Sequence, residues 1–179
     1  MSRNYDILFS AAEIQTRVQE LGAQISRDYQ GKDLVLVAML KGSIYFMADL
    51  TRAIDLPIAF DLIGISSLGR ASQDAGIVRV TKDLDLEIEG REVLVVEEIV
   101  RSGLTTNYML QYLEKRRPKS LRLISLLANP EQQLIDLPLD YLGFEIDYSR
   151  VVGYGMDFRE QDRHLPFIAS LDKERYKGQ

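Results

Sequence analysis

"VLVVEEIVRSGLTT" (residues 93–106) is the most informative stretch of this chain. Four apolar residues lead into two adjacent carboxylates, Glu97 and Glu98, and the small residues Ser102 and Gly103 follow shortly after. A short, continuous apolar run is typical of a strand that is buried on both faces. The small polar residues predict a tight turn into a helix. We therefore predict a strand that ends at the acidic pair and a helix that begins just after the turn.

Similar apolar runs recur on both sides of this stretch, and helical patterns separate them. A Ser10–Glu13 capping box precedes the first of these helical patterns. The predicted helices are 11–29, 43–54 and 104–116, and the predicted strands are 33–40, 57–66, 77–82, 92–98, 120–128 and 140–146. This alternation predicts an α/β fold with a mostly parallel sheet and right-handed crossovers. Because neither a linker nor an internal repeat interrupts the pattern, we expect a single domain over residues 1–179.

The composition narrows the class of protein. The chain has 179 residues, 46% of them apolar, and a formal net charge of −5. A protein that binds nucleic acid normally carries a basic surface, so we expect no such partner. The lack of cysteine and the single histidine exclude disulfides and thiolate or histidine-rich metal sites. Residues 1–10 lack the apolar run of a secretory signal, and no stretch approaches the roughly 20 apolar residues of a membrane span. We therefore expect a soluble, cytoplasmic protein.

The turn after the acidic pair has the features of a phosphate site. Residues 101–106 offer successive backbone amides at the start of a helix, and Ser102, Thr105 and Thr106 add hydroxyls. Gly103 permits a close approach of the anion. A lone glycine loop is weak evidence, but an acidic pair followed by Ser-Gly-x-Thr after a buried strand is more specific.

Other polar residues are expected to share this edge of the sheet. The two carboxylates, Glu97 and Glu98, would repel a phosphate, so we expect them to face a ribose diol or a hydrated divalent cation. Ligands of parallel sheets bind beyond the carboxyl ends of the strands, where we also place Lys41 and Asn129. The small, polar segment 66–76 is expected to form a flexible loop over the same edge.

Residues 93–106 resemble the ribose-phosphate motif of the type I phosphoribosyltransferases, which bind phosphoribosyl pyrophosphate (PRPP). Four further stretches resemble the hypoxanthine-guanine phosphoribosyltransferases within that group. They are the pyrophosphate loop "LKGS" (40–43), the flexible catalytic loop "SSLG" (66–69), "KDLDLEIEGREVLVVEE" (82–98) and the purine and metal segment "VVGYGMDFREQDRHLPFI" (151–168). The resemblance covers residues 10–172 and implies the type I phosphoribosyltransferase fold, with a small hood and a flexible loop.

The resemblance also implies a reaction, in which a purine nitrogen displaces pyrophosphate from ribose C1 with the help of Mg²⁺. It places the catalytic positions at Glu97, Glu98, Arg101, Ser67 and Leu68. It places PRPP and its phosphates at Lys41, Gly42, Ser102, Gly103, Leu104, Thr105, Thr106 and Arg163. It places the base at Ile99, Asn129, Arg150, Val151 and Asp157, and the metal at Asp157, Glu97 and Glu98. Because members of the family associate, the resemblance implies a homodimer or homotetramer.

The chain departs from the family pattern mainly on the side of the base. Arg101 replaces the aspartate that the family places near the purine N7 as a proton acceptor, and arginine stays protonated at neutral pH. Leu68 replaces an aromatic residue of the flexible loop, Asn129 replaces a lysine, and Arg150 replaces the aromatic residue that stacks on the base. Glu98 replaces an aspartate and keeps its charge.

Three hypotheses follow from these departures. The chain is a working hypoxanthine-guanine enzyme with unusual residues, a phosphoribosyltransferase for another, anionic acceptor, or a catalytically impaired relative that binds PRPP or a purine nucleotide as a regulator. General base catalysis contributes about 10²–10⁴-fold, so we expect ordinary 6-oxopurine activity to be weak or absent.

Overall fold

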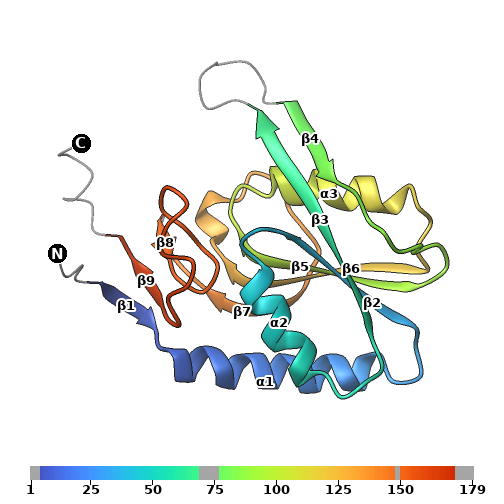
Figure 1. The fold of residues 1–179 in the computed structure, drawn as a ribbon, viewed down its shortest axis with the longest axis horizontal. Helices are drawn as coiled ribbons and strands as arrows, with labels where there is room; N and C mark the ends of the chain where they lie inside the picture. Colours follow the sequence, from blue (N-terminus) through green and yellow to red (C-terminus); the bar gives the residue numbers. More distant parts are fainter. Residues whose placement is uncertain (1–4, 69–76, 148–149, 172–179) are drawn as a thin grey trace.

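A computed structural model describes residues 5–68, 77–147 and 150–171 of the chain (Figure 1). The elements in chain order are β1 (Asp6–Phe9), α1 (Ala11–Asp28), β2 (Leu34–Leu40), α2 (Ile44–Ala53), β3 (Ala59–Leu68), β4 (Ile77–Lys82), β5 (Glu92–Val100), α3 (Leu104–Glu114), β6 (Ser120–Ala128), the short 3-10 helix η1 (Pro130–Gln132), β7 (Leu139–Glu145), β8 (Val151–Val152) and β9 (Ile168–Ser170).

The larger sheet has six strands in the order β4-β3-β2-β5-β6-β7. The pairs β2/β3, β2/β5, β5/β6 and β6/β7 are parallel, and only the edge strand β4 is antiparallel to its neighbour β3. The α/β prediction with a mostly parallel sheet is therefore confirmed. The first helix also begins as predicted, because the Ser10 hydroxyl accepts a hydrogen bond from the Glu13 amide and the Glu13 carboxylate accepts one from the Ser10 amide.

Helices cover both faces of this sheet, which explains why its central strands are apolar throughout. Leu94 and Val96 of β5 belong to the core that also contains buried residues of α1 and α2. Val93 and Val95 belong to a second core, which contains Met109 of α3. Figure 1 shows α3 on the opposite side of the sheet from α1 and α2. The carboxyl ends of the parallel strands therefore open between these two layers.

A smaller sheet joins the two ends of the described chain. Its three antiparallel strands have the order β1-β9-β8, and Figure 1 shows it beside the carboxyl end of the larger sheet. This sheet corresponds to the small hood that the family resemblance implies. The sequence patterns did not predict β1, β8 or β9, because strands of two to four residues are too short to show a period.

Two of the predicted boundaries that differ from the structure lie next to the residues of the predicted site. The strand predicted to end at the acidic pair continues to Val100, because Ile99 and Val100 pair with β6 and Val100 is buried. Glu97 and Glu98 therefore lie inside β5 and not beyond its end. The predicted loop 66–76 also begins too early, since β3 runs to Leu68 and pairs there with β4. The rest of that predicted loop, 69–76, lies outside the described residues.

Candidate active site

The turn between β5 and α3 has the geometry that a phosphate cradle requires. Gly103 adopts a left-handed φ of +79°, and a Cβ at this position would lie 3.2 Å from a side-chain carbon of Leu137. Glycine is therefore favoured both by backbone conformation and by space. The amides of the first turn of α3 have no partners within the helix, and they point toward its N-terminal end. Ser102 and Thr105 are partly buried beside this end, whereas the side chain of Leu104 is exposed.

The acidic pair connects this turn with the loop after β2. The Thr106 hydroxyl donates a 3.1 Å hydrogen bond to Oε1 of Glu97, so this hydroxyl contacts the acidic pair. Glu98 extends elsewhere, because a Cβ on Gly42 would lie 2.0 Å from its Oε1. One carboxylate therefore contacts the start of α3, and the other contacts the backbone next to Lys41.

Glu97 is buried and Glu98 is half-buried, which is more burial than the polar chemistry of a carboxylate favours. Glu97 is fully buried, and the Oε2 atoms of Glu97 and Glu98 are buried without a hydrogen-bond partner. Burial, and next the Glu98 carboxylate, raise the pKa of Glu97 well above its usual range. Burial raises the pKa of Glu98 to about 7, although a backbone hydrogen bond, Arg163 and Arg101 act in the opposite direction. A buried oxygen without a partner is costly, so these atoms favour a ligand that brings hydrogen-bond donors or positive charge.

The loop after β2 touches the segment between β8 and β9. Gly155 has a φ of +102°, and a Cβ there would lie 1.9 Å from the carbonyl oxygen of Gly42. The two backbones therefore meet with no side chain between them. This contact places Lys41, which directly follows β2 as predicted, beside the residues that surround Asp157.

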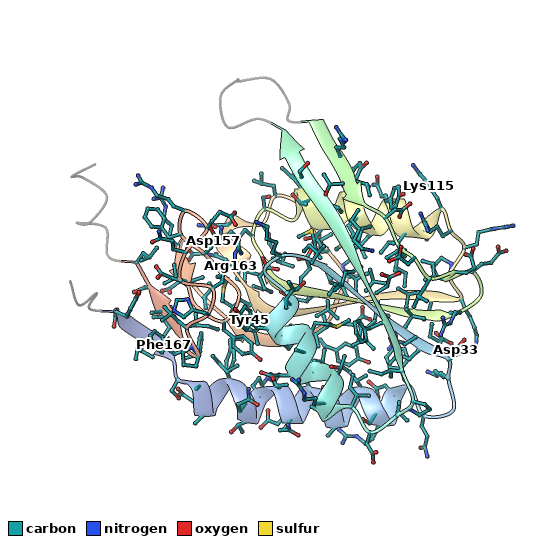
Figure 2. The ribbon with its side chains drawn as sticks, viewed as in Figure 1. Asp33, Tyr45, Lys115, Asp157, Arg163 and Phe167 are labelled. Carbon is teal, nitrogen blue, oxygen red and sulfur yellow. The ribbon has the colours of Figure 1, made fainter. Side chains whose placement is uncertain are left out.

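A network of ion pairs holds the predicted pyrophosphate ligands. Lys41 Nζ lies 2.8 Å from Oε2 of Glu160, and the Arg163 guanidinium contacts Asp157 at 2.8 Å and Glu160 at 3.3 Å. Arg163 also donates a 2.7 Å hydrogen bond to the carbonyl oxygen of Gly155. Figure 2 shows the side chains of Asp157 and Arg163 next to each other beside β8. The two cations therefore converge on Glu160, which the sequence patterns did not single out.

Some residues of the predicted base side line a pocket of about 380 Å³, which we call the arginine pocket. It is lined by Arg101, Arg150, Val151, Asp157, Phe158, Arg159 and Leu171. The structure thus brings together four of the positions that the sequence pointed to, Arg101, Arg150, Val151 and Asp157. It adds a third arginine, Arg159, whose guanidinium carbon lies 5.2 Å from the centre of the Phe158 ring. No pattern in the sequence marked Arg159, because only the folded backbone turns it toward the other two.

Four other predicted residues do not line this pocket. Asn129 is buried directly after β6, and its backbone N–H donates a 3.1 Å hydrogen bond to the carbonyl oxygen of Val100. Ile99 packs against the core that contains α1 and α2. Ser67 and Leu68 are the last residues of β3, and their side chains are not described.

Neither a preformed metal cage nor a membrane span is found in the described part of the chain. Over residues 5–68, 77–147 and 150–171, no three His, Cys, Asp or Glu side chains are grouped closely enough to hold a metal ion. Within the same residues, no helix has both the length and the apolar content to cross a bilayer.

Comparison with known proteins identifies the family. A model of the phosphoribosyl transferase domain matches residues 4–159. The chain is 42% identical over 177 residues to a hypoxanthine-guanine phosphoribosyltransferase from Mycobacterium avium. This match covers 96% of this chain and 87% of that protein. It is 39% identical over 172 residues to the protein of the same name from Bacillus subtilis, and the match covers 96% of each chain.

Solved structures agree with this assignment. A hypoxanthine phosphoribosyltransferase from Staphylococcus aureus superimposes with a TM-score of 0.90 at 40% identity, over 96% of this chain and 93% of that one. A hypoxanthine-guanine phosphoribosyltransferase from Bacillus anthracis, solved with a HEPES molecule in its active site, also gives a TM-score of 0.90, at 42% identity, over 95% of this chain and 100% of that one. The chain therefore belongs to the phosphoribosyltransferases and, within them, to the hypoxanthine-guanine phosphoribosyltransferase family of purine salvage.

Proposed function

We propose that this protein binds PRPP together with Mg²⁺ and transfers the phosphoribosyl group to the nitrogen of a base, with release of pyrophosphate. The observation that carries the proposal is the position of the acidic pair. Glu97 contacts the amide-rich start of α3 and Glu98 contacts the loop that bears Lys41, so the pair connects the two places that we propose for the phosphates of PRPP. A ribose bound between them would offer its two hydroxyls to the buried, unpartnered Oε2 atoms.

Each end of PRPP has suitable partners in this arrangement. The 5′-phosphate would accept hydrogen bonds from the amides of residues 101–106, which the helix dipole of α3 favours. The pyrophosphate would bind Lys41 and Arg163, whose positive charges oppose the charge that the leaving group gains as its bond to C1 breaks. Glu160 now contacts both cations, so the pyrophosphate would have to displace its carboxylate.

The residues fit a Mg²⁺ ion that the substrate itself largely holds. Mg²⁺ commonly binds one or two carboxylates together with substrate phosphates and water. The acidic pair offers buried oxygens without partners, whereas both oxygens of Asp157 already accept bonds, from Arg163 and from the Glu160 amide. Glu97 and Glu98 are therefore the better candidates for direct contact, and Asp157 would act by positioning Arg163. When bound, the ion would neutralise part of the charge on the pyrophosphate.

Turnover of hypoxanthine or guanine is expected to be weak. Arg101 occupies the family's position for a proton acceptor and lines the arginine pocket. Because a guanidinium cannot accept a proton at neutral pH, the loss of general base catalysis should lower kcat/KM by about 10²–10⁴-fold relative to an ordinary family member. Efficient nucleotide formation from PRPP, Mg²⁺ and either base would contradict this part of the proposal.

Calorimetry tests the other part of the proposal, the binding of PRPP together with Mg²⁺. Titration with PRPP and Mg²⁺ should show saturable binding whether or not hypoxanthine turns over, and no binding would overturn the proposed function. A nucleotide-binding regulator is a second candidate, because three arginines beside a phosphate loop could hold further phosphates. Tight binding of GMP or guanosine tetraphosphate, without turnover of any base, would favour that candidate.

A further inference from the structure

We infer that a hydrogen bond between Tyr154 and Asp49 positions both cations of the proposed pyrophosphate site, Lys41 and Arg163. The inference rests on the proposed function, since it names residues that hold the ligands of the leaving group in place. Neither Tyr154 nor Asp49 is among the residues that the family resemblance places at PRPP, the base or the metal. Their effect is carried by the backbone of Gly155, which directly follows Tyr154.

The hydrogen bond joins the segment between β8 and β9 to the two helices on one face of the larger sheet. The Tyr154 hydroxyl donates a 2.6 Å hydrogen bond to Oδ2 of Asp49, which lies in α2. The same oxygen accepts a 2.8 Å hydrogen bond from Nε2 of Gln15 in α1. Tyr154 is only 5% exposed, so water competes little for its hydroxyl. A hydrogen bond to a carboxylate is also stronger than one between neutral groups.

The backbone of Tyr154 needs such support. Its φ of +46° lies in the left-handed region, which is uncommon for a residue with a bulky side chain. A conformation of this kind persists where the surrounding contacts hold it. Here the side chain bonds to Asp49, and the backbone N–H donates a 2.8 Å hydrogen bond to the carbonyl oxygen of Leu165. The direction in which the chain enters Gly155 therefore depends on where the Tyr154 side chain is held.

Gly155 contacts the surroundings of both cations. A Cβ on Gly155 would lie 1.9 Å from the carbonyl oxygen of Gly42, the residue after Lys41. Gly155 and Arg163 also exchange two hydrogen bonds. The Gly155 backbone N–H donates one of 2.9 Å to the Arg163 carbonyl oxygen, and the Arg163 guanidinium donates one of 2.7 Å to the Gly155 carbonyl oxygen. A shift of Gly155 would therefore displace the loop of Lys41 and the guanidinium of Arg163 together.

Tyr154→Phe tests the inference, because it removes the hydroxyl and keeps the ring. Calorimetry measures the affinity of the full-length protein for ribose 5-phosphate, and then that of the saturated protein for pyrophosphate with Mg²⁺. The first ligand probes the turn at residues 101–106, and the second probes Lys41 and Arg163. We expect the variant to bind pyrophosphate about 5-fold or more weakly, with less than about a 2-fold change for ribose 5-phosphate. Unchanged affinity for pyrophosphate would overturn the inference, as would an equal loss for both ligands, which indicates a general loss of structure.

Tyr141→Phe is the matched control. Tyr141 is also buried, and its hydroxyl donates a 2.8 Å hydrogen bond to Oδ2 of Asp28 at the last residue of α1. This variant loses a hydrogen bond of the same kind, and it should leave the affinity for pyrophosphate unchanged. A loss as large as that of Tyr154→Phe would overturn the inference.

Two variants of Asp49 test the other partner. Asp49→Asn keeps a carbonyl oxygen that can accept the Tyr154 hydroxyl, so it should retain most of the affinity for pyrophosphate. Asp49→Leu has no acceptor and should lose as much affinity as Tyr154→Phe. Equal affinities of the two Asp49 variants would overturn the inference. If the unmodified protein binds neither PRPP nor pyrophosphate, the proposed function fails and the inference fails with it. If it binds both and Tyr154→Phe binds them equally well, only the inference is wrong.

Discussion

The protonation of Glu98 links the stability of the protein to pH. Burial raises its pKa to about 7 from an ordinary value of 4.5, so the native state keeps this proton to a higher pH than the unfolded chain does. Between these two pH values the native state binds more protons, and its stability falls as the pH rises. The contribution of Glu98 to the stability of the protein does not change with pH below its ordinary pKa or above its raised pKa.

Glu98→Gln should therefore stabilise the protein increasingly as the pH rises. We expect little difference from the unmodified protein near pH 4.5 and a gain on the order of 1–3 kcal/mol in the free energy of unfolding near pH 8. Denaturant unfolding of both proteins across this range measures the difference. A difference that does not change with pH would show that the Glu98 carboxylate is not destabilised by burial.

Arg101, Asn129 and Arg150 offer a test of the base side at the residue scale. The triple variant Arg101→Asp, Asn129→Lys, Arg150→Phe restores the residue types of the family pattern, including a proton acceptor. We expect its turnover of hypoxanthine to rise by about 10-fold or more, which is part of the gain that general base catalysis gives. The assay is nucleotide formation from PRPP and Mg²⁺, with circular dichroism to confirm folding. A well-folded triple variant without any gain would show that further residues, such as Arg159, exclude the purine.

At the scale of elements, the segment between β8 and β9 contains the carboxylate that competes with the proposed leaving group. The hydrogen bond from Lys41, and next the charge of Arg163, lower the pKa of Glu160, so it is ionised at neutral pH. Lys41 and Glu160 are both largely exposed, with side-chain exposures of 66% and 65%, and water weakens the attraction within such an exposed ion pair. We therefore expect the Glu160 carboxylate to compete only weakly with pyrophosphate for Lys41 and Arg163.

Glu160→Gln should tighten the binding of pyrophosphate by about 2–5-fold, because it removes the competing charge and keeps the size of the side chain. Calorimetry with pyrophosphate and Mg²⁺ measures the change. Glu114→Gln, an exposed acid at the end of α3, is the control for the altered net charge. Weaker binding by the Glu160 variant would indicate instead that this carboxylate holds Lys41 and Arg163 in their productive positions.

Elements with a long apolar run were predictable from the sequence, and short or interrupted ones were not. The runs of β2, β5 and β6 are buried on both faces and can be recognised without any partner. The end of β5 could not be placed, because Glu97 and Glu98 look like a solvated strand end until the protein around them is known. The strands of the small sheet depend on pairing between residues 6–9 and 168–170, which no local pattern records.

At the scale of the whole molecule, the acidic pair and the turn after it could be placed together from the sequence, and the residues of the arginine pocket only in part. Gly103 and Thr106 lie within ten residues of the acidic pair, so their spacing along one stretch indicated a common site. Arg101 and Arg159 lie 58 residues apart in sequence, and only the fold brings them into one pocket. Lys41 and Glu160 are also far apart in sequence, and only the fold brings their side chains into contact. The family pattern located the positions that had changed, but it could not show that a third arginine had joined them.

The contact between Gly42 and Gly155 connects the two halves of the proposed reaction. Because a Cβ on Gly155 would lie 1.9 Å from the Gly42 carbonyl oxygen, neither backbone can shift toward the other, and a displacement of one loop reaches the other directly. The first loop carries Lys41, and the second leads into Asp157 and Arg159 of the arginine pocket. Occupancy on one side should therefore alter affinity on the other, and such an effect is reciprocal by thermodynamic necessity.

This coupling can be measured as a thermodynamic cycle. The affinity of the base with and without pyrophosphate should differ by about 5-fold or more, and the affinity of pyrophosphate should change by the same factor when the base is bound. Gly155→Ala forces the two loops apart and should reduce that factor toward one. A cycle without coupling in the unmodified protein would mean that leaving group and acceptor are handled independently, despite two backbones in direct contact.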